Sequence, residues 1–154
     1  MGESLVFSSD KKFTIARISN VVGPGMSCDN FIGLLLKEAQ YSGELHFQTS
    51  KDSKKDYIWI DDVIESLIRC KNNNLSKIYN ICSGVSISNL YLASVFKNNG
   101  INVTFEANAP KISFIDIDNN SFKKDTGYLP GNCADRLESL ISDEITKWNS
   151  DCEH

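Results

Sequence analysis

Apolar and polar residues follow one another along this chain in runs that predict alternating strands and helices. The first apolar run, residues 13–18, is interrupted by only two polar residues, a pattern typical of a strand buried on both faces of a parallel sheet. The turn residues Gly23, Pro24 and Gly25 end this segment. Ligands of open α/β sheets bind beyond the carboxyl ends of strands, so we expect Asn20 and the backbone of residues 21–25 at a binding site.

Two helices in the first half of the chain are predicted from apolar residues that recur every three or four positions. Residues 27–30 offer side chains that can cap a helix reaching about Gln40. A capping box at Asp62 and Glu65 opens the next helix. The expected inner faces are Phe31, Leu34, Leu35 and Glu38 in the first helix, and Val63, Ile64, Leu67 and Ile68 in the second.

The second half of the chain is predicted to hold two longer helices and a short one. Ser88 caps a helix that ends at Gly100, and a capping box at Asp135 and Glu138 opens the last helix. A short helix over residues 119–126 ends at Gly127. The last helix turns Leu137, Leu140, Ile141, Ile145 and Trp148 to one face. Short strands are expected at residues 45–47, 57–60, 78–82, 103–105 and 112–117.

Composition narrows the class of protein. A length of 154 residues with 41% hydrophobic residues fits one globular domain over residues 1–154, in which residues 151–154 are interpreted as a tail or a tag remnant. A net charge of −4 argues against nucleic acid or an anionic membrane as the partner. The chain has no apolar run of about 20 residues and five cysteines without C-x-x-C spacing. We therefore expect a cytoplasmic protein with reduced thiols.

Four segments occur in the order known from one enzyme family. They are Arg17-x-x-Asn20-x-x-Gly23-Pro24, the run from Lys55 to Val63 (KDYIWIDDV), the run from Ile78 to Gly84 (IYNICSG), and the stretch from Asp116 to Pro130. Together they resemble the extended short-chain dehydrogenases, the NAD-dependent nucleotide-sugar epimerases, dehydratases and reductases. The resemblance implies an α/β fold, with Rossmann-like strands and helices joined to a small α+β substrate lobe. It also implies a role in surface polysaccharide biosynthesis, with NAD or NADP as the cofactor of the full-length enzyme.

Two motifs of that family are missing from this sequence. The glycine-rich loop that holds the dinucleotide phosphates is absent, and none of the five tyrosines is followed four residues later by lysine, as in the family's proton-transfer pair Tyr-x-x-x-Lys. We therefore expect the chain to be the C-terminal, substrate-facing part of such an enzyme, without the N-terminal dinucleotide-binding half. By itself it should be inactive, contain no catalytic residue and bind no cofactor.

The alternative is a natural, non-catalytic module that binds nucleotide sugars or serves in assembly. In either case the apolar strands at residues 13–18 and 78–82 would lack their usual partners in the N-terminal half. Unpaired apolar edges favour association, so the sequence predicts a homo-oligomer.

The resemblance implies a nucleotide-sugar site at Asn20, Asn30, Phe31, Lys55, Tyr57 and Lys111, and it places Val21 and Pro24 near the nicotinamide of the full-length enzyme. The amide of Asn20 can donate to a phosphate oxygen. Lys55 stands where the family carries an arginine, so it supplies charge without the planar, two-pronged geometry of guanidinium. Purely structural roles stay open for four of these residues. Asn30 fits a helix cap, Phe31 a core residue, Lys55 a solvated loop charge and Tyr57 strand packing.

The other residues with potentially reactive side chains are interpreted as structural. The carboxylate pairs Asp61-Asp62 and Asp116-x-Asp118 fit helix caps better than acid/base or metal chemistry. His46 has no Cys, His or Asp at ligand spacing, and Cys82 fits a small core residue. No metal site is expected.

Overall fold

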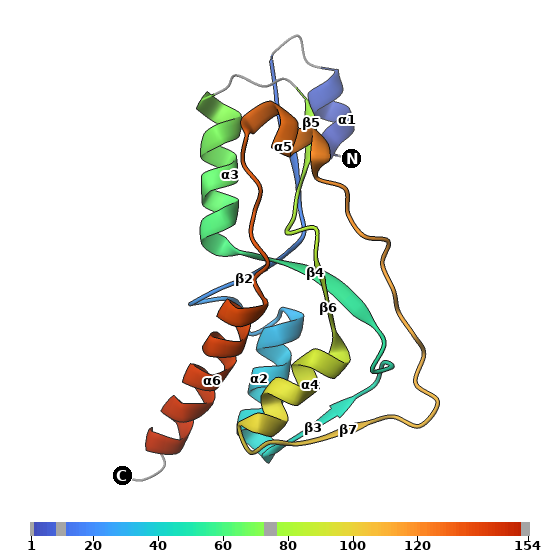
Figure 1. The fold of residues 1–154 in the computed structure, drawn as a ribbon, viewed down its shortest axis with the longest axis vertical. Helices are drawn as coiled ribbons and strands as arrows, with labels where there is room; N and C mark the ends of the chain where they lie inside the picture. Colours follow the sequence, from blue (N-terminus) through green and yellow to red (C-terminus); the bar gives the residue numbers. More distant parts are fainter. Residues whose placement is uncertain (1, 9–11, 73–76, 152–154) are drawn as a thin grey trace.

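The computed structural model describes residues 2–8, 12–72 and 77–151, which form α-helices and short β-strands in alternation (Figure 1). In chain order the elements are α1 (Gly2–Phe7), β1 (Ile15–Ile18), β2 (Asn20–Val22), α2 (Phe31–Ser42), β3 (Glu44–Phe47), β4 (Lys54–Trp59), α3 (Ile60–Asn72), β5 (Ile78–Ile81), β6 (Ser86–Ser88), α4 (Asn89–Asn98), β7 (Asn102–Phe105), α5 (Asn120–Thr126) and α6 (Ala134–Asp151). The α/β class expected from the sequence is confirmed.

The described strands pair in three small sheets, and most of the pairs join segments far apart in the chain. β1 runs parallel to β5, with Ile15 opposite Ile78. β2 runs parallel to β4, which pairs antiparallel with β6 on its other side. β3 and β7 form a third, parallel pair. The parallel pairs require crossover connections, and helices lie within each of these connections, as expected of an α/β fold.

Two groups of elements lie at opposite ends of the molecule, and the sheet of β2, β4 and β6 crosses between them (Figure 1). We call α1, β1, α3, β5 and α5 the α3 lobe, and α2, β3, α4, β7 and α6 the α6 lobe. Each has its own buried cluster. The larger cluster fills the α6 lobe and includes Leu45, Phe96 and Ile141, whereas the smaller one joins Val63 of α3 to Tyr79 of β5 and Phe122 of α5.

Helix α2 begins where the sequence predicts but turns a different face inward. The side chain of Asn30 caps it, because Oδ1 accepts a hydrogen bond of 2.7 Å from the backbone N–H of Gly33. Its buried residues are Ile32, Gly33, Leu35, Leu36 and Ala39. Leu34 and Glu38 point outward, so the predicted inner face is wrong by one position, a rotation of about 100° around the helix axis.

Helix α3 departs further from the prediction. It begins at Ile60, so Asp62 lies inside the first turn rather than at the cap. The buried side carries Asp62, Val63, Ser66 and Cys70. The carboxylate of Asp62 turns inward because it accepts a hydrogen bond of 2.5 Å from the Tyr128 hydroxyl. Three of the four residues predicted to face inward are instead exposed, namely Ile64, Leu67 and Ile68.

The C-terminal helix buries the predicted face but starts earlier than predicted. α6 begins at Ala134, whose N–H donates a hydrogen bond of 3.0 Å to Asn132 Oδ1, and Asp135 therefore lies within the first turn. The predicted cap at Ser88 is confirmed, because its hydroxyl accepts a hydrogen bond from the N–H of Tyr91. The short helix ending at Gly127 is also confirmed.

Two strand predictions need correction. Residues 112–117 form no strand among the described residues, only an isolated bridge between Ser113 and Lys54, and Ile115 is 94% exposed. β1 is present but is not buried on both faces, because Arg17 and Ile18 are exposed. The next strand along the chain, β2, covers Asn20–Val22, for which the sequence analysis predicted no strand.

Within the described ranges, no helix combines the length and the apolar character needed to cross a lipid bilayer.

Candidate functional site

Two clefts meet at Asn20, the second residue beyond the end of β1. The larger cleft, of about 570 Å³, is lined by Asn20 and Lys55 and closed on one side by Phe114 and Ile115. The smaller cleft, of about 330 Å³, is lined by Asn20 together with Val21, Asn30, Phe31 and Tyr57. Asn20 is the residue that the two linings have in common.

Asn20 is held in place by the strand beside it. Its backbone pairs with Tyr57 in the β2–β4 ladder, and its Nδ2 atom donates a hydrogen bond of 2.8 Å to the carbonyl oxygen of Asp56. That bond uses one of the two N–H groups of the amide. The amide carbonyl accepts no hydrogen bond from the described residues, so one donor and one acceptor remain for a ligand.

Lys55 presents a positive charge at the same site. Its Nζ atom lies 4.0 Å from the ring centroid of Phe31, a distance suited to a cation–π contact. Partial burial lowers the pKa of this ammonium group. In the described part of the chain no carboxylate forms an ion pair with Lys55, so its charge is not neutralised by the protein.

Asn30 and Phe31 lie at the site but also have structural roles. The Asn30 side chain caps α2, as described above, and Phe31 packs edge-on against Phe47 with ring centroids 6.4 Å apart. The structural roles considered for Asn30 and Phe31 are therefore correct in part. The aromatic ring of Phe31 still forms the surface on which the Lys55 ammonium rests.

Tyr57 lies on β4 and belongs to the larger buried cluster, as the strand-packing interpretation predicts. Only 1% of the residue is exposed, and burial raises the pKa of its phenol far above the ordinary value. None of the described residues forms a hydrogen bond with this hydroxyl, although Tyr57 lines the smaller cleft. Among the described residues no fully buried side-chain oxygen lacks a hydrogen bond, so this hydroxyl oxygen is open to the cleft and available to a ligand there.

Lys111 and Pro24 lie outside the two clefts that the other predicted site residues line. Lys111 is exposed on the segment after β7, and Pro24 is exposed in the turn after β2. Neither lines either of the two clefts. The structure therefore brings together Asn20, Val21, Asn30, Phe31, Lys55 and Tyr57, and it leaves out Lys111 and Pro24.

Sequence reasoning missed Asp56, the residue that holds the site together. It is 4% exposed, and its carboxylate accepts hydrogen bonds from the Ser19 hydroxyl, the Ser83 hydroxyl and the N–H groups of Ser83 and Gly84. These bonds tie the end of β1 and the turn after β5 to β4. The sequence predicted the strand only from Tyr57, whereas β4 begins at Lys54 and so includes Asp56, whose buried charge requires several donors.

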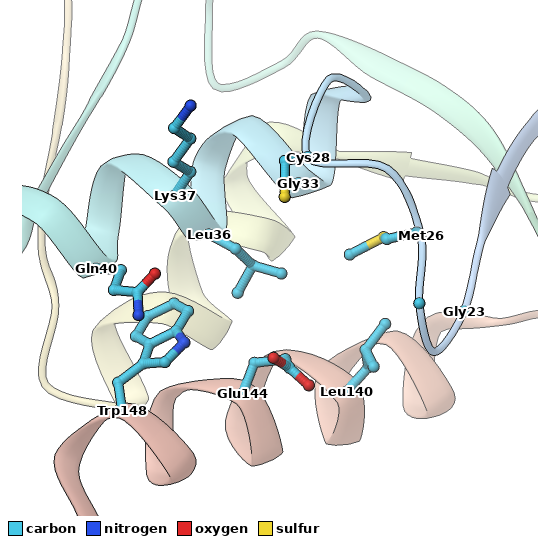
Figure 2. Close-up of a pocket in the computed structure, with 11 residues that line it drawn as sticks. Gly23, Met26, Cys28, Gly33, Leu36, Lys37, Gln40, Leu140, Glu144 and Trp148 are labelled. Atoms are coloured by element: carbon cyan, nitrogen blue, oxygen red, sulfur yellow. The ribbon is translucent and has the colours of Figure 1, made fainter. Parts of the chain in front are cut away.

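A third cleft lies between α2, α6 and the loop that follows β2, and Gly23 and Gly25 of the predicted turn line it. It measures about 360 Å³, and its walls are mainly apolar, from Met26, Leu36, Leu140 and Trp148 (Figure 2). The carboxylate of Glu144 at its edge is paired with Lys147 at 2.7 Å. The sequence analysis predicted Leu140 and Trp148 as core residues and Gly23 and Gly25 as turn residues, but it predicted no ligand site between α2 and α6.

The other polar groups have structural partners, as the sequence indicates. His46 bonds to Thr104 and Glu106 at the exposed edge of β3. Cys82 is fully buried, and burial raises the pKa of its thiol to about 11. The carboxylate of Asp116 is bound by Lys54 and Ser86. Among the described residues, no cluster of three or more His, Cys, Asp or Glu side chains could hold a metal ion.

Known proteins resemble this chain in sequence and in fold. The model of the NAD dependent epimerase/dehydratase family matches residues 1–82. No curated protein matches the chain. Solved structures share its fold, and the chain spans about half the length of each.

Three of these structures illustrate the likeness. The UDP-glucuronic acid 4-epimerase from Bacillus cereus, solved with UDP-glucuronic acid and NAD, is 18% identical with a TM-score of 0.76 over 94% of this chain and 48% of that chain. The NAD-dependent NDP-hexosamine 5,6-dehydratase TunA of tunicamycin biosynthesis is 23% identical, with a TM-score of 0.75 over 97% and 50%. The UDP-glucose 4-epimerase from Thermotoga maritima, solved with UDP-glucose, is 18% identical, with a TM-score of 0.73 over 94% and 49%. The family match covers more than half of the 154 residues, and the chain therefore belongs to the NAD dependent epimerase/dehydratase family.

Proposed function

We propose that this chain is the nucleotide-sugar-binding part of an NAD(P)-dependent epimerase, dehydratase or reductase, and that it is the C-terminal part of that enzyme. The observation that carries the proposal is the charge of Lys55, which is half-buried and not neutralised by a carboxylate of the described residues. An ammonium group in this position attracts an anion, and a diphosphate is the anion that a nucleotide sugar supplies.

The arrangement of the two clefts supports an extended ligand. Asn20 lies where they meet, beside Lys55 in the larger cleft and Tyr57 in the smaller one. A diphosphate over Asn20 would accept a hydrogen bond from its free N–H and would face the Lys55 ammonium. The unpartnered hydroxyl of Tyr57 would then bond to a polar group of the ligand in the smaller cleft.

In this proposal the other part of the enzyme holds the cofactor. Of the two residues that the resemblance places near the nicotinamide, Pro24 is exposed and Val21 packs against the smaller buried cluster. NAD(P), held by the other part of the enzyme, would supply hydride transfer. The residues of this chain would bind the diphosphate and keep the sugar in a fixed position relative to that cofactor.

Calorimetric titration of the chain with UDP-glucose, UDP-glucuronic acid and dTDP-, GDP- and CDP-sugars tests the proposal. Lys55→Ala removes a charge-assisted hydrogen bond to the diphosphate, and Asn20→Ala removes a hydrogen bond from the amide N–H to the same group. Each replacement should weaken binding by about tenfold to a hundredfold. Lys97→Ala is the matched control, because Lys97 is exposed on α4 and lines neither cleft. Lys111→Ala should also have no effect. Equal affinity of wild type and Lys55→Ala, or no binding of any of these compounds, would contradict the proposal.

A further inference from the structure

The third cleft, between α2, α6 and the loop that follows β2, has the form of a small-molecule site (Figure 2). Its volume of about 360 Å³ lies within the range of protein ligand pockets, which begins at about 300 Å³. Leu36 and Leu140 line it and are only 7% and 8% exposed, because both belong to the larger buried cluster. The cleft therefore opens directly onto the core of the α6 lobe.

Helix α6 supplies one wall of this cleft. Its lining residues Leu140, Glu144 and Trp148 follow one another at a spacing of four. Residues four apart lie on the same face of a helix, and Figure 2 shows all three on the side of α6 that faces α2. The wall is therefore apolar, with a single carboxylate between an aliphatic and an aromatic side chain.

The charge of Glu144 is only partly satisfied by the protein. Its Oε1 atom accepts a hydrogen bond of 2.7 Å from Lys147 Nζ, and the lysine side chain is 66% exposed. The other oxygen, Oε2, accepts no hydrogen bond from any residue that the structure describes. Exposed ion pairs between neighbouring turns of a helix are weak, so this carboxylate can still bind a ligand.

The wall formed by α2 presents no positive charge to the cleft. Figure 2 shows the ammonium group of Lys37 directed away from α6, whereas the amide of Gln40 reaches toward Trp148. Within the described part of the chain the Gln40 side chain has no hydrogen-bond partner, so its carbonyl oxygen can accept a bond from a ligand. The charge inside the cleft therefore complements a cation rather than an anion.

We propose that this cleft binds a small amine with an apolar body. The ammonium group lies against the Glu144 carboxylate and the Trp148 ring, and the hydrocarbon part lies between Met26, Leu36 and Leu140. A carboxylate forms charge-assisted hydrogen bonds with an ammonium group, and the indole ring is the strongest aromatic partner for a cation. The inference does not depend on the proposed function, because this cleft shares no lining residue with the two clefts at Asn20.

Three probes that differ only in their head group test the site, namely phenylpropylamine, phenylpropanol and phenylpropionate at neutral pH. The readout is the NMR signal of the Trp148 indole N–H. Trp59 is the only other tryptophan and does not line the cleft, so it serves as an internal reference, and Trp59→Phe assigns the two signals. Cys28 gives a second readout, because it lines the cleft and a bound amine should slow its reaction with Ellman's reagent.

The amine should shift the Trp148 signal saturably and bind about tenfold more tightly than the alcohol, and the carboxylate should bind most weakly. Glu144→Gln should reduce the affinity for the amine to that for the alcohol and leave the affinity for the alcohol unchanged. Asp143→Asn is the matched control, because Asp143 is the exposed neighbour on α6 and does not line the cleft. It should change neither affinity.

Four results would overturn the inference. They are equal affinity for the amine and the alcohol, tightest binding of the carboxylate, equal affinity of wild type and Glu144→Gln for the amine, and no saturation by the amine up to about 20 mM. Calorimetric titration with UDP-sugars reports separately on the proposed function, since Asn20 and Lys55 lie outside this cleft.

Discussion

Asp56 Oδ1 accepts a hydrogen bond of 2.7 Å from the hydroxyl of Ser19, a residue 37 positions earlier in the chain. The same carboxylate binds the turn at Ser83 and Gly84, so one buried charge connects three segments that converge on the proposed site. The carbonyl of Asp56 also accepts the hydrogen bond that orients Asn20. Asp56 is therefore a positioning residue for the site.

Replacing Asp56 by asparagine should destabilise the fold by about 2–3 kcal/mol. The N–H groups of the new amide would face N–H and O–H donors from which the carboxylate now accepts hydrogen bonds. Urea unfolding measures this change. Asp52→Asn is the control, since Asp52 is exposed in the loop before β4 and should cost little. Equal stability of the Asp56 and Asp52 variants would show that the network contributes no net stabilisation.

Gly23 should not tolerate a side chain. A Cβ atom at this position would lie 2.5 Å from Ile60 Cγ2, closer than carbon atoms can approach. Gly23→Ala should therefore lower the free energy of unfolding by about 1–3 kcal/mol through overpacking between the turn after β2 and the start of α3. Gly131→Ala is the matched control, because nothing lies within 4 Å of a Cβ atom there. Thermal or urea unfolding of the two variants makes the comparison, and equal stabilities would contradict it.

Asp125 should make stability depend on acid pH. Hydrogen bonds from Lys77, at 2.6 Å, and from Tyr79, at 2.7 Å, hold the pKa of this carboxyl below its ordinary value of 3.8. A depressed pKa stabilises the fold above the ordinary value, and this contribution is lost as pH falls through the lower, folded-state pKa. Unfolding measured between about pH 5 and pH 2 should therefore be less pH-dependent in Asp125→Asn than in wild type. Asp143→Asn, on the exposed side of α6, serves as control. If stability depended on pH in the same way in Asp125→Asn and in wild type, this prediction would be refuted.

The cysteines should differ sharply in reactivity. Cys28 is exposed, whereas Cys70, Cys82 and Cys133 are buried, and burial raises the pKa values of the Cys82 and Cys133 thiols to about 11. The thiolate is the reactive form, so both burial and the high pKa slow reaction at neutral pH. With Cys152→Ser in the background, Ellman's reagent at pH 8 should label one thiol rapidly, and Cys28→Ser should abolish that phase. Rapid labelling of a second thiol in the folded protein would indicate that one of the buried thiols is accessible.

Arginine at position 55 should bind a diphosphate better than lysine does. Guanidinium can donate two parallel hydrogen bonds to phosphate and can still stack on the Phe31 ring that now lies 4.0 Å from Lys55 Nζ. Lys55→Arg should raise the affinity for UDP-glucose by about threefold to tenfold in calorimetric titration. Lys97→Arg provides the comparison at an exposed position of α4. A weaker complex with Lys55→Arg would mean that the cleft is shaped for the narrower ammonium group.

The sequence predicted much of the local structure because caps and strands depend on neighbouring residues. Asn30 and Ser88 cap the helices that follow them, and the strands at residues 45–47, 78–82 and 103–105 are present. The segments around Asn20 and Lys55 were also predicted to come together, and both residues line one cleft.

By contrast, only the tertiary structure decided which side of α2 and of α3 is covered. Apolar spacing describes the angles between side chains around a helix, but it does not say where the neighbouring element lies. Leu34 and Ile68 therefore fit a periodic pattern and are nevertheless exposed. Residues 112–117 alternate like a strand but form only an isolated bridge, between Ser113 and Lys54. The positions of Lys111 outside the clefts and of Asp56 in the wall of the larger one likewise depend on contacts between distant segments, which no local pattern records.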